Sequence, residues 1–334
     1  MACILVTGAT GFVGSELVKR LLREGERVRI FHRAASTMDL IGDAIRDVEP
    51  FTGDIRDPAA LDDALRGCEL VYHTAARIGF GGRGERKLLM RTNVDGTATV
   101  VNAALRQGIR RLVHVSSMAA FGRPERPNGI IDEESEWQRS KANSAYALSK
   151  YLAELEVHRG VAEGLDAVIV NPALIFGVGR TGDNTRRIID RLRAGTLPAI
   201  PAGGTNVVDV EDVVEGMILA MRSGRSGERY FLGSQNLSWR TIIQELADAL
   251  GVAPPRLRLG ARPALAVAYA SEAFALVTGA RAFVTRESVR AASKTYRYSN
   301  RKARHELGWN PRPFHETAQR IAEALEEASQ SASR

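Results

Sequence analysis

The chain has 334 residues, of which 44% are apolar and 25% charged, a balance typical of a globular protein with one large domain or two unequal lobes. Its net charge of +7 comes largely from arginines that are scattered along the chain, which argues against a nucleic-acid interface. The two cysteines have no metal-ligand spacing, so we expect no metal site. We expect both to be reduced thiols, which suits a protein of the cytoplasm.

Neither a secretory leader nor a membrane span is expected. Met1 leads directly into an apolar run that is typical of a buried strand rather than of a signal peptide. The most apolar segment, Pro263–Gly279, falls short of the roughly 18 uncharged residues that a span requires, and Glu272 interrupts it. We predict a buried or half-buried helix there, with a membrane-surface or partner-binding face as the alternative.

The first 170 residues alternate apolar runs with amphipathic stretches. The apolar runs hardly alternate with polar residues, which is typical of strands that are buried on both faces of a parallel sheet. The predicted strands are Ile4–Thr7, Val28–His32, Glu49–Thr52, Leu70–His73, Leu112–Ser116 and Ala167–Val170. The predicted helices between them are Gly14–Glu24, Pro58–Leu65, Leu88–Gln107 and Ser144–Gly160. This alternation predicts an α/β fold with a doubly wound parallel Rossmann sheet.

After Pro172 the pattern loosens, and we predict a smaller, mostly helical C-terminal lobe. The elements expected there are a helix at Thr185–Ala194, a strand at Val207–Val210, a helix at Glu211–Met221, a strand at Arg229–Leu232 and a helix at Trp239–Leu250. One unit would comprise residues 1–171, with about 205–235 returning to it, and the other residues 172–204 and 236–328.

A glycine-rich turn joins the first predicted strand to the first predicted helix. Gly8 and Gly11 would let the backbone approach a diphosphate closely, and Gly14 would let the helix pack on the sheet. The N–H groups at the start of the helix would meet the negative charge. The G-x-x-G-x-x-G spacing in this setting predicts that the first unit binds a dinucleotide.

The end of the second predicted strand indicates which dinucleotide fits. An NAD site usually places a carboxylate there for the ribose 2′-hydroxyl, but His32 and Arg33 occupy this segment. A guanidinium binds a 2′-phosphate with two hydrogen bonds, so Arg33 favours NADP(H), with a solvated loop residue as the alternative. The carboxylate of Asp54 is a candidate acceptor for the adenine amino group, whereas the neighbouring Asp57 is a candidate helix cap ahead of Pro58.

Tyr146 and Lys150 lie four residues apart in a predicted helix, so both occupy one face. An ammonium beside the phenol would lower the tyrosine pKa from about 10, which would make Tyr146 an acid/base. Ser116 and Ser117 end the fifth predicted strand, where open parallel sheets bind ligands, and Ser117 would orient a substrate oxygen. Together these side chains predict a hydride-transfer site, although Tyr-x-x-x-Lys alone also fits an ordinary surface helix.

These features resemble the extended short-chain dehydrogenase/reductase (NAD-dependent epimerase/dehydratase) family, in particular its dihydroflavonol-reductase-like branch. The segments that carry the resemblance are Thr7–Gly14, Asp54–Asp57, His73–Ala76, Asn93–Thr97, Ser116–Ser117, Tyr146–Lys150, Asn171–Gly177 and Val208–Val213. The resemblance implies that the catalytic residues are Ser117, Tyr146 and Lys150. It implies cofactor contacts at Gly8, Thr10, Gly11, Phe12, Val13, Gly14, Arg33, Asp54, Ile55, Thr74, Ala75, Ala76, Asn93, Ser116, Tyr146, Lys150, Pro172, Ala173 and Leu174.

The implied function is NADP(H)-dependent hydride transfer to or from a carbonyl or secondary alcohol of a small or medium, largely apolar substrate. Candidate substrate contacts near predicted strand ends are Phe80, Phe121 and Phe176, with plain core packing as the alternative. Nucleotide-sugar dehydratases carry an acid after the serine position, but Met118 and Ala119 follow Ser117, so a dehydratase is not expected.

Two other functions stay open. A nucleotide-sugar or related sugar epimerase would keep NAD(P) tightly bound and would need basic residues for a uridine diphosphate, such as Arg186, Arg187 and Arg191. A non-catalytic NADP-sensing protein is the third function, although such relatives usually lose Tyr-x-x-x-Lys. The resemblance also implies a homodimer that forms through the helices near 93–107 and 144–160.

Overall fold

Seven parallel strands form the central sheet of the computed structural model, in the order β11-β7-β5-β4-β1-β2-β3. The strands are β1 (Cys3–Thr7), β2 (Arg27–His32), β3 (Glu49–Thr52), β4 (Cys68–His73), β5 (Arg111–Val115), β7 (Ala167–Pro172) and β11 (Arg229–Leu232). The structure describes residues 3–79, 83–124, 129–140, 142–181, 184–278 and 285–332. The six strands predicted before Pro172, and the one predicted at Arg229–Leu232, are confirmed as members of one Rossmann sheet.

Helices cover both faces of this sheet because the strand side chains alternate between two apolar clusters. Val6 and Ile30 belong to one cluster, and Leu5 and Phe31 to the other. The helices over the first cluster are α1 (Phe12–Arg23) and α7 (Val210–Ser223). Those over the second are α2 (Pro58–Leu65), α4 (Gly96–Arg106) and α5 (Ala145–Ala162). Since all seven strands are parallel, their carboxyl ends meet at one edge, where the predicted site residues are placed.

Two shorter elements complete this half of the molecule. A 3-10 helix, Gly42–Asp47, precedes β3, and α11 (Arg301–Leu307) packs against α7 and β11. The C-terminal part of the chain therefore returns to the Rossmann sheet before its last helix.

The helix predicted at Leu88–Gln107 is divided into three parts. α3 (Arg83–Leu89) leads into a π-helical turn, Met90–Asp95, which leads into α4. Asn93 is 1% exposed within this wider turn. Such turns insert one extra residue and are frequent at functional sites, but so short a segment cannot be distinguished from the surrounding α-helix by its apolar pattern.

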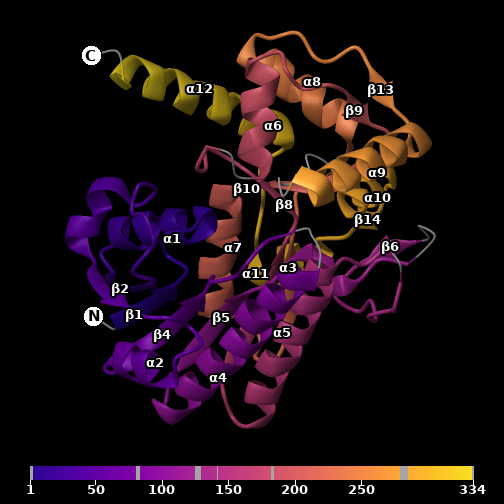
Figure 1. Cartoon of the computed structure of the whole chain (residues 1–334). Coiled ribbons are helices and arrows are strands. Elements are labelled where there is room, and N and C mark those ends of the chain that lie inside the picture. Colours follow the sequence, from indigo (N-terminus) through magenta and orange to yellow (C-terminus); the bar gives the residue numbers. More distant parts are fainter. Residues whose placement is uncertain are drawn as a thin grey trace.

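Apart from α7, β11 and α11, the described elements after Pro172 build a second lobe, which fills the upper part of Figure 1. Its three-stranded sheet has the order β12-β10-β8, with β8 (Leu174–Phe176), β10 (Gly204–Asp209) and β12 (Gln235–Ser238). Around a third apolar cluster pack α6 (Asn184–Arg193), α8 (Trp239–Leu250) and α12 (Phe314–Ala332). Two small ladders pair β9 (Ile200–Pro201) with β13 (Arg258–Leu259) and β6 (Ile130–Ile131) with β14 (Arg297–Tyr298). The helices predicted in this region, and the strand predicted at Val207–Val210, are confirmed.

The helix predicted at Pro263–Gly279 is present as α9 (Ala261–Thr278) and is half-buried, with one side packed and the other exposed. Three of its large apolar side chains lie at the surface, with exposed fractions of 50% for Val267, 54% for Tyr269 and 66% for Phe274. The helix packs on α10 (Arg286–Ser293) through small residues such as Ala268, so its bulky side chains are left outside. Among the described residues, no helix combines the length and apolarity that crossing a membrane requires.

Candidate active site

The glycine turn between β1 and α1 forms a cradle that is lined by backbone. Gly8 has a φ of 70°, which favours glycine, and a Cβ on it would lie 2.5 Å from the main-chain nitrogen of Ala75. A Cβ on Gly14 would lie 2.2 Å from the carbonyl oxygen of Gly8. Gly11 is the N-cap of α1 and has no side chain with which to cap the first N–H groups, so these groups are available to an anion.

A segment of the second lobe reaches this turn. A Cβ on Gly179 would lie 3.2 Å from the Phe12 ring, which shows how closely the two segments pack. The Arg180 guanidinium donates to the carbonyl oxygen of Thr10 at 3.4 Å and forms two hydrogen bonds of 2.8 Å with Asp39. Arg180 is absent from the predicted site residues, because no sequence spacing connects it to the glycine turn.

Two arginines surround one carboxylate at the ends of β2 and β3. The side chain of Arg33 is exposed, and Arg56 forms a bidentate pair with Asp54 at 2.9 and 2.5 Å. The hydrogen bond from Arg56, with a smaller contribution from the charge of Arg33, holds the pKa of Asp54 at about 2 although burial raises it. Asp57 caps α2 by accepting from the Ala59 N–H at 3.0 Å, which confirms the prediction of a helix cap.

The loop after β4 is fixed by hydrogen bonds to its neighbours. The Thr74 hydroxyl donates to the Thr7 carbonyl oxygen at 2.7 Å. Asn93 accepts from the Arg77 N–H at 2.7 Å and donates to the Ser149 hydroxyl at 2.9 Å, so its amide connects the loop to α5. The other predicted cofactor residues lie in the first turn of α1, after β3, after β4 and from β7 into β8; they are Val13, Ile55, Ala76, Pro172, Ala173 and Leu174.

Ser117 and Tyr146 come together at the carboxyl end of β5. Ser117 precedes a 3-10 turn, Met118–Phe121, and its hydroxyl accepts from the Ala119 N–H at 3.2 Å. Burial raises the pKa of Tyr146, while a side-chain hydrogen bond with Ser117 lowers it, and the net direction is upward. The prediction that Lys150 lowers the pKa of Tyr146 is therefore wrong for this structure. The hydroxyl of Ser116 is buried, without a hydrogen-bond partner among the described residues.

Lys150 lies inside the protein rather than in solvent. It is 1% exposed, and its Nζ donates to the Val115 carbonyl oxygen at 2.8 Å and lies 3.5 Å from Nε2 of His114. Burial lowers the pKa of Lys150 to about 8, and the charge of Glu154 opposes that shift. The ammonium is bound on the β5 side, and Lys150 is not among the groups that shift the pKa of Tyr146 in this structure.

Two buried histidines lie beneath the ammonium. The nitrogens of His73 are 2.7 Å from the Thr7 hydroxyl and 3.0 Å from the Thr97 hydroxyl, and its ring centroid is 5.1 Å from that of His114. Burial, followed by the charge of Lys150, lowers the pKa of His73 to about 3 and that of His114 well below its usual range. Both imidazoles are therefore neutral near pH 7. Sequence reasoning missed this pair, and the signal that could have found it is a titratable residue inside two apolar strands.

Two of the three predicted substrate residues lie in the apolar core. Phe121 is 2% exposed and packs edge-on against Phe231, with ring centroids 6.0 Å apart. Phe176 is 0% exposed and packs against Phe314 at 4.9 Å. In this structure Phe121 and Phe176 make core-packing contacts, which was the alternative to substrate contact for both residues. Phe80 lies outside the described residues.

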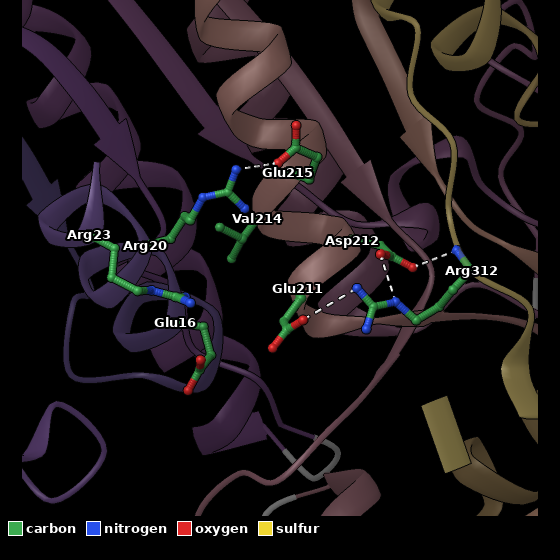
Figure 2. A pocket seen from close by; sticks show the side chains of 8 residues that line it. All are labelled: Glu16, Arg20, Arg23, Glu211, Asp212, Val214, Glu215 and Arg312. Carbon is green, nitrogen blue, oxygen red and sulfur yellow. Dashed lines mark hydrogen bonds and ion pairs between the residues drawn. The ribbon is translucent and has the colours of Figure 1, made fainter. Parts of the chain in front are cut away.

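A charged cavity lies between α1 and α7, and its lining does not include Ser117, Tyr146 or Lys150 (Figure 2). Its lining consists of Glu16, Arg20, Arg23, Glu211, Asp212, Val214, Glu215 and Arg312. Arg20 pairs with Glu215 at 2.8 Å and Arg312 with Asp212 at 3.0 Å, so these contacts join the helices to the segment before α12. In the part of the chain that the structure describes, no cluster of His, Cys, Asp or Glu side chains is arranged to hold a metal ion.

The parallel sheet, the backbone cradle at its edge and the Ser117, Tyr146 and Lys150 side chains beside it define an NAD(P)-dependent enzyme of the extended short-chain dehydrogenase/reductase type. Residues 4–233 match the model of the NAD dependent epimerase/dehydratase family, and the chain belongs to this family. It is thus an oxidoreductase of the epimerase/dehydratase type.

Individual relatives extend over most of the chain. Sterol demethylase protein B of Methylococcus capsulatus is 38% identical over 266 residues, which are 77% of each protein. Dihydroflavonol 4-reductase of Zea mays is 29% identical over 73% of each protein. The dTDP-glucose 4,6-dehydratase DesIV of Streptomyces venezuelae, solved with NAD and TYD bound, is 25% identical over 97% of each chain, with a TM-score of 0.78. Similar proteins therefore include reductases and a dehydratase, one of them with bound NAD.

Proposed function

We propose that the protein is an NADP(H)-dependent carbonyl reductase or alcohol dehydrogenase for a small or medium, largely apolar substrate. The observation that carries the proposal is the meeting of Ser117 with the buried Tyr146, whose pKa the Ser117 side chain lowers, and with the buried Lys150 one helical turn further along α5. The names of two relatives, which refer to a sterol and a dihydroflavonol, favour a largely apolar substrate.

The residues present fit a dinucleotide. Side chains on Gly8 or Gly14 would collide with the main chain around the turn at the start of α1, and the hydroxyl of Ser116 lies buried without a partner among the described residues. The glycine turn and the N–H groups of α1 would hold the diphosphate, and Arg33 the 2′-phosphate. When bound, the nicotinamide supplies or accepts the hydride.

The chain itself supplies the proton and the orientation. The Tyr146 phenol, which keeps its proton near neutral pH because burial raises its pKa, donates that proton to the substrate oxygen in reduction. The Ser117 hydroxyl donates a hydrogen bond to the same oxygen and orients it. The Lys150 ammonium places a positive charge behind the site, where it favours the negative charge that develops during the reaction. In oxidation these proton transfers run in the opposite direction.

A panel of carbonyl compounds tests the proposal. We expect stoichiometric oxidation of NADPH with aromatic or alicyclic ketones and aldehydes, measured by absorbance of the reduced cofactor together with identification of the alcohol product. Polar sugar nucleotides serve as the comparison set. Consumption of no NADPH with any carbonyl compound would contradict the proposed function.

Arg33 provides a separate prediction about the cofactor. Arg33→Ala removes a charge-assisted, bidentate contact worth about 1.5–3 kcal/mol, so KM for NADPH should rise about 10- to 100-fold while KM for NADH stays near the parent value. Arg46→Ala is the matched control, because this arginine has a side chain that is 80% exposed and pairs with Asp43. Equal NADPH affinity in the two variants would show that Arg33 is only a solvated loop residue.

A sugar epimerase with tightly held NAD(P) is the second candidate. The similarity to a structure with bound TYD favours it, and Arg186 on α6 is one of the basic residues predicted for a diphosphate. In the structure Arg186 pairs with Asp190 at 2.7 Å, so its charge is already balanced. An epimerase would co-purify with its cofactor and show no net consumption of NADPH, which separates the two functions in one assay.

We also propose a cytoplasmic homodimer. Leu155 on α5 is 44% exposed, which supports the pairing through α4 and α5 that the family resemblance implies. Cys3 and Cys68 are free thiols whose sulfurs lie 3.1 Å apart, which supports a reducing compartment.

A further inference from the structure

Titratable side chains recur along one side of α5. Tyr146, Lys150, Glu154 and His158 are spaced four residues apart, which places them on one face of the helix. Glu154 is 1% exposed, although a carboxylate is rarely buried unless it is paired. The proposed function uses Tyr146 and Lys150 and leaves this buried acid without a role.

Groups from two strands hold the Glu154 carboxylate. The side-chain nitrogen of Asn171, at the end of β7, donates to one carboxylate oxygen at 2.5 Å, and Arg229 of β11 donates to the other at 3.4 Å. The same nitrogen of Asn171 donates to the Ser117 carbonyl oxygen at 3.0 Å. Through Asn171, the carboxylate therefore orients the main chain that carries the Ser117 hydroxyl.

Glu154 also acts on Lys150 through its charge. Burial lowers the pKa of the Lys150 ammonium to about 8, and Glu154 is the group that raises it. The groups that face Lys150 from the neighbouring strands are His114 and His73, whose pKa values burial holds far below neutrality, so neither offers a compensating charge.

The surroundings of Glu154 itself are positively charged or neutral. Arg229 lies beside its carboxylate, and His158 lies one turn further along α5. Burial lowers the pKa of His158 and the charge of Glu154 opposes this, so His158 adds little positive charge near pH 7. Within the described residues, Glu154 is the acidic side chain that acts on Lys150.

We propose that Glu154 is a positioning residue for the hydride-transfer site: its carboxylate fixes the Ser117 main chain through Asn171 and places a buried negative charge one helical turn from Lys150. The inference rests on the proposed function for its kinetic consequences only, because the protonation of Lys150 is a property of the chain itself.

Direct titration of Lys150 tests the electrostatic half. Glu154→Gln keeps the shape and one acceptor oxygen of the side chain but removes its charge. The chain has six lysines, so a ¹³Cε-lysine NMR titration is tractable, and the spectrum of Lys150→Met identifies the Lys150 signal. We expect the Lys150 midpoint to fall by about one pH unit in Glu154→Gln. An unchanged midpoint would overturn the proposal.

The pH profile of carbonyl reduction provides the second readout. In Glu154→Gln the alkaline limb of the kcat–pH profile should move to lower pH by the same amount as the Lys150 midpoint. The loss of kcat relative to the parent should therefore be larger at pH 8 than at pH 6. Glu154→Asp retains the charge and should keep the alkaline limb of the parent. An equal loss at all pH values, with an unmoved limb, would mean that Glu154 is merely structural and would overturn the proposal.

Glu133→Gln is the matched control. Glu133 is also a buried carboxylate, 7% exposed, that accepts from the Phe231 N–H at 2.7 Å, but it follows β6 and lies off α5. This variant should lower the unfolding temperature without moving the alkaline limb, and an equal shift in both variants would overturn the proposal. If no carbonyl compound is reduced, the proposed function fails, while the NMR titration still decides the role of Glu154.

Discussion

Tyr146→Phe should slow hydride transfer by about 10²- to 10⁴-fold while the protein stays folded. The substitution removes one oxygen and leaves the ring in place. The alkoxide that forms from a reduced carbonyl then lacks its proton donor. Single-turnover oxidation of NADPH at saturating cofactor measures the chemical step, and a fluorescence titration measures the Kd of NADPH separately. We expect that Kd to remain close to the parent value.

Tyr151→Phe is the control for that experiment. Tyr151 lies on the same helix, and its ring stacks on Trp137 with centroids 4.6 Å apart. This variant should turn over like the parent. Equal rates in Tyr146→Phe and Tyr151→Phe would show that another group is the acid, and the proposed mechanism would then be rejected.

Gly14→Ala should weaken cofactor binding and destabilise the fold. The added methyl carbon would lie 2.2 Å from the Gly8 carbonyl oxygen and 2.8 Å from the Thr74 hydroxyl oxygen, so the glycine turn has to move. Overpacking of this kind lowers the free energy of unfolding by about 1–3 kcal/mol. Because the turn is the predicted diphosphate seat, a displacement near 1 Å should raise the Kd of NADPH by about 100-fold.

Thermal unfolding and a fluorescence titration with NADPH measure both effects. Gly84→Ala provides the comparison, because Gly84 lies exposed in α3 and a Cβ on it would meet nothing within 4 Å. Alanine is the better helix former by about 1 kcal/mol, so this variant should be neutral or slightly more stable. Parent-like NADPH affinity in Gly14→Ala would refute the assignment of the turn to the diphosphate.

The central sheet was predictable because its strands are continuous apolar runs, a pattern that local sequence contains. The strands of two to four residues in the second lobe were not predictable, since so short a segment shows no measurable periodicity of apolar residues. The π-helical turn at Met90–Asp95 escaped prediction for a related reason: it preserves the apolar positions of α4 and changes only the winding before them.

The candidate site divides in the same way. The glycine turn and the Tyr146–Lys150 pair follow from spacing within one segment. The direction in which the Tyr146 pKa shifts does not follow from spacing, because it depends on burial and on the Val115 carbonyl that binds the Lys150 ammonium. Glu154 and Arg180 depend on partners far away in the sequence, which no local pattern reveals.

The contact of the second lobe with the glycine turn constrains how this protein can be re-engineered. Phe12 packs on Gly179, and Arg180 crosses to Thr10 and Asp39, so a stretch of the C-terminal half contacts the turn that we propose holds the coenzyme. A chimera that exchanges this half to gain a new specificity would also exchange that guanidinium. A junction placed after residue 181 retains the guanidinium and its contacts with Thr10 and Asp39.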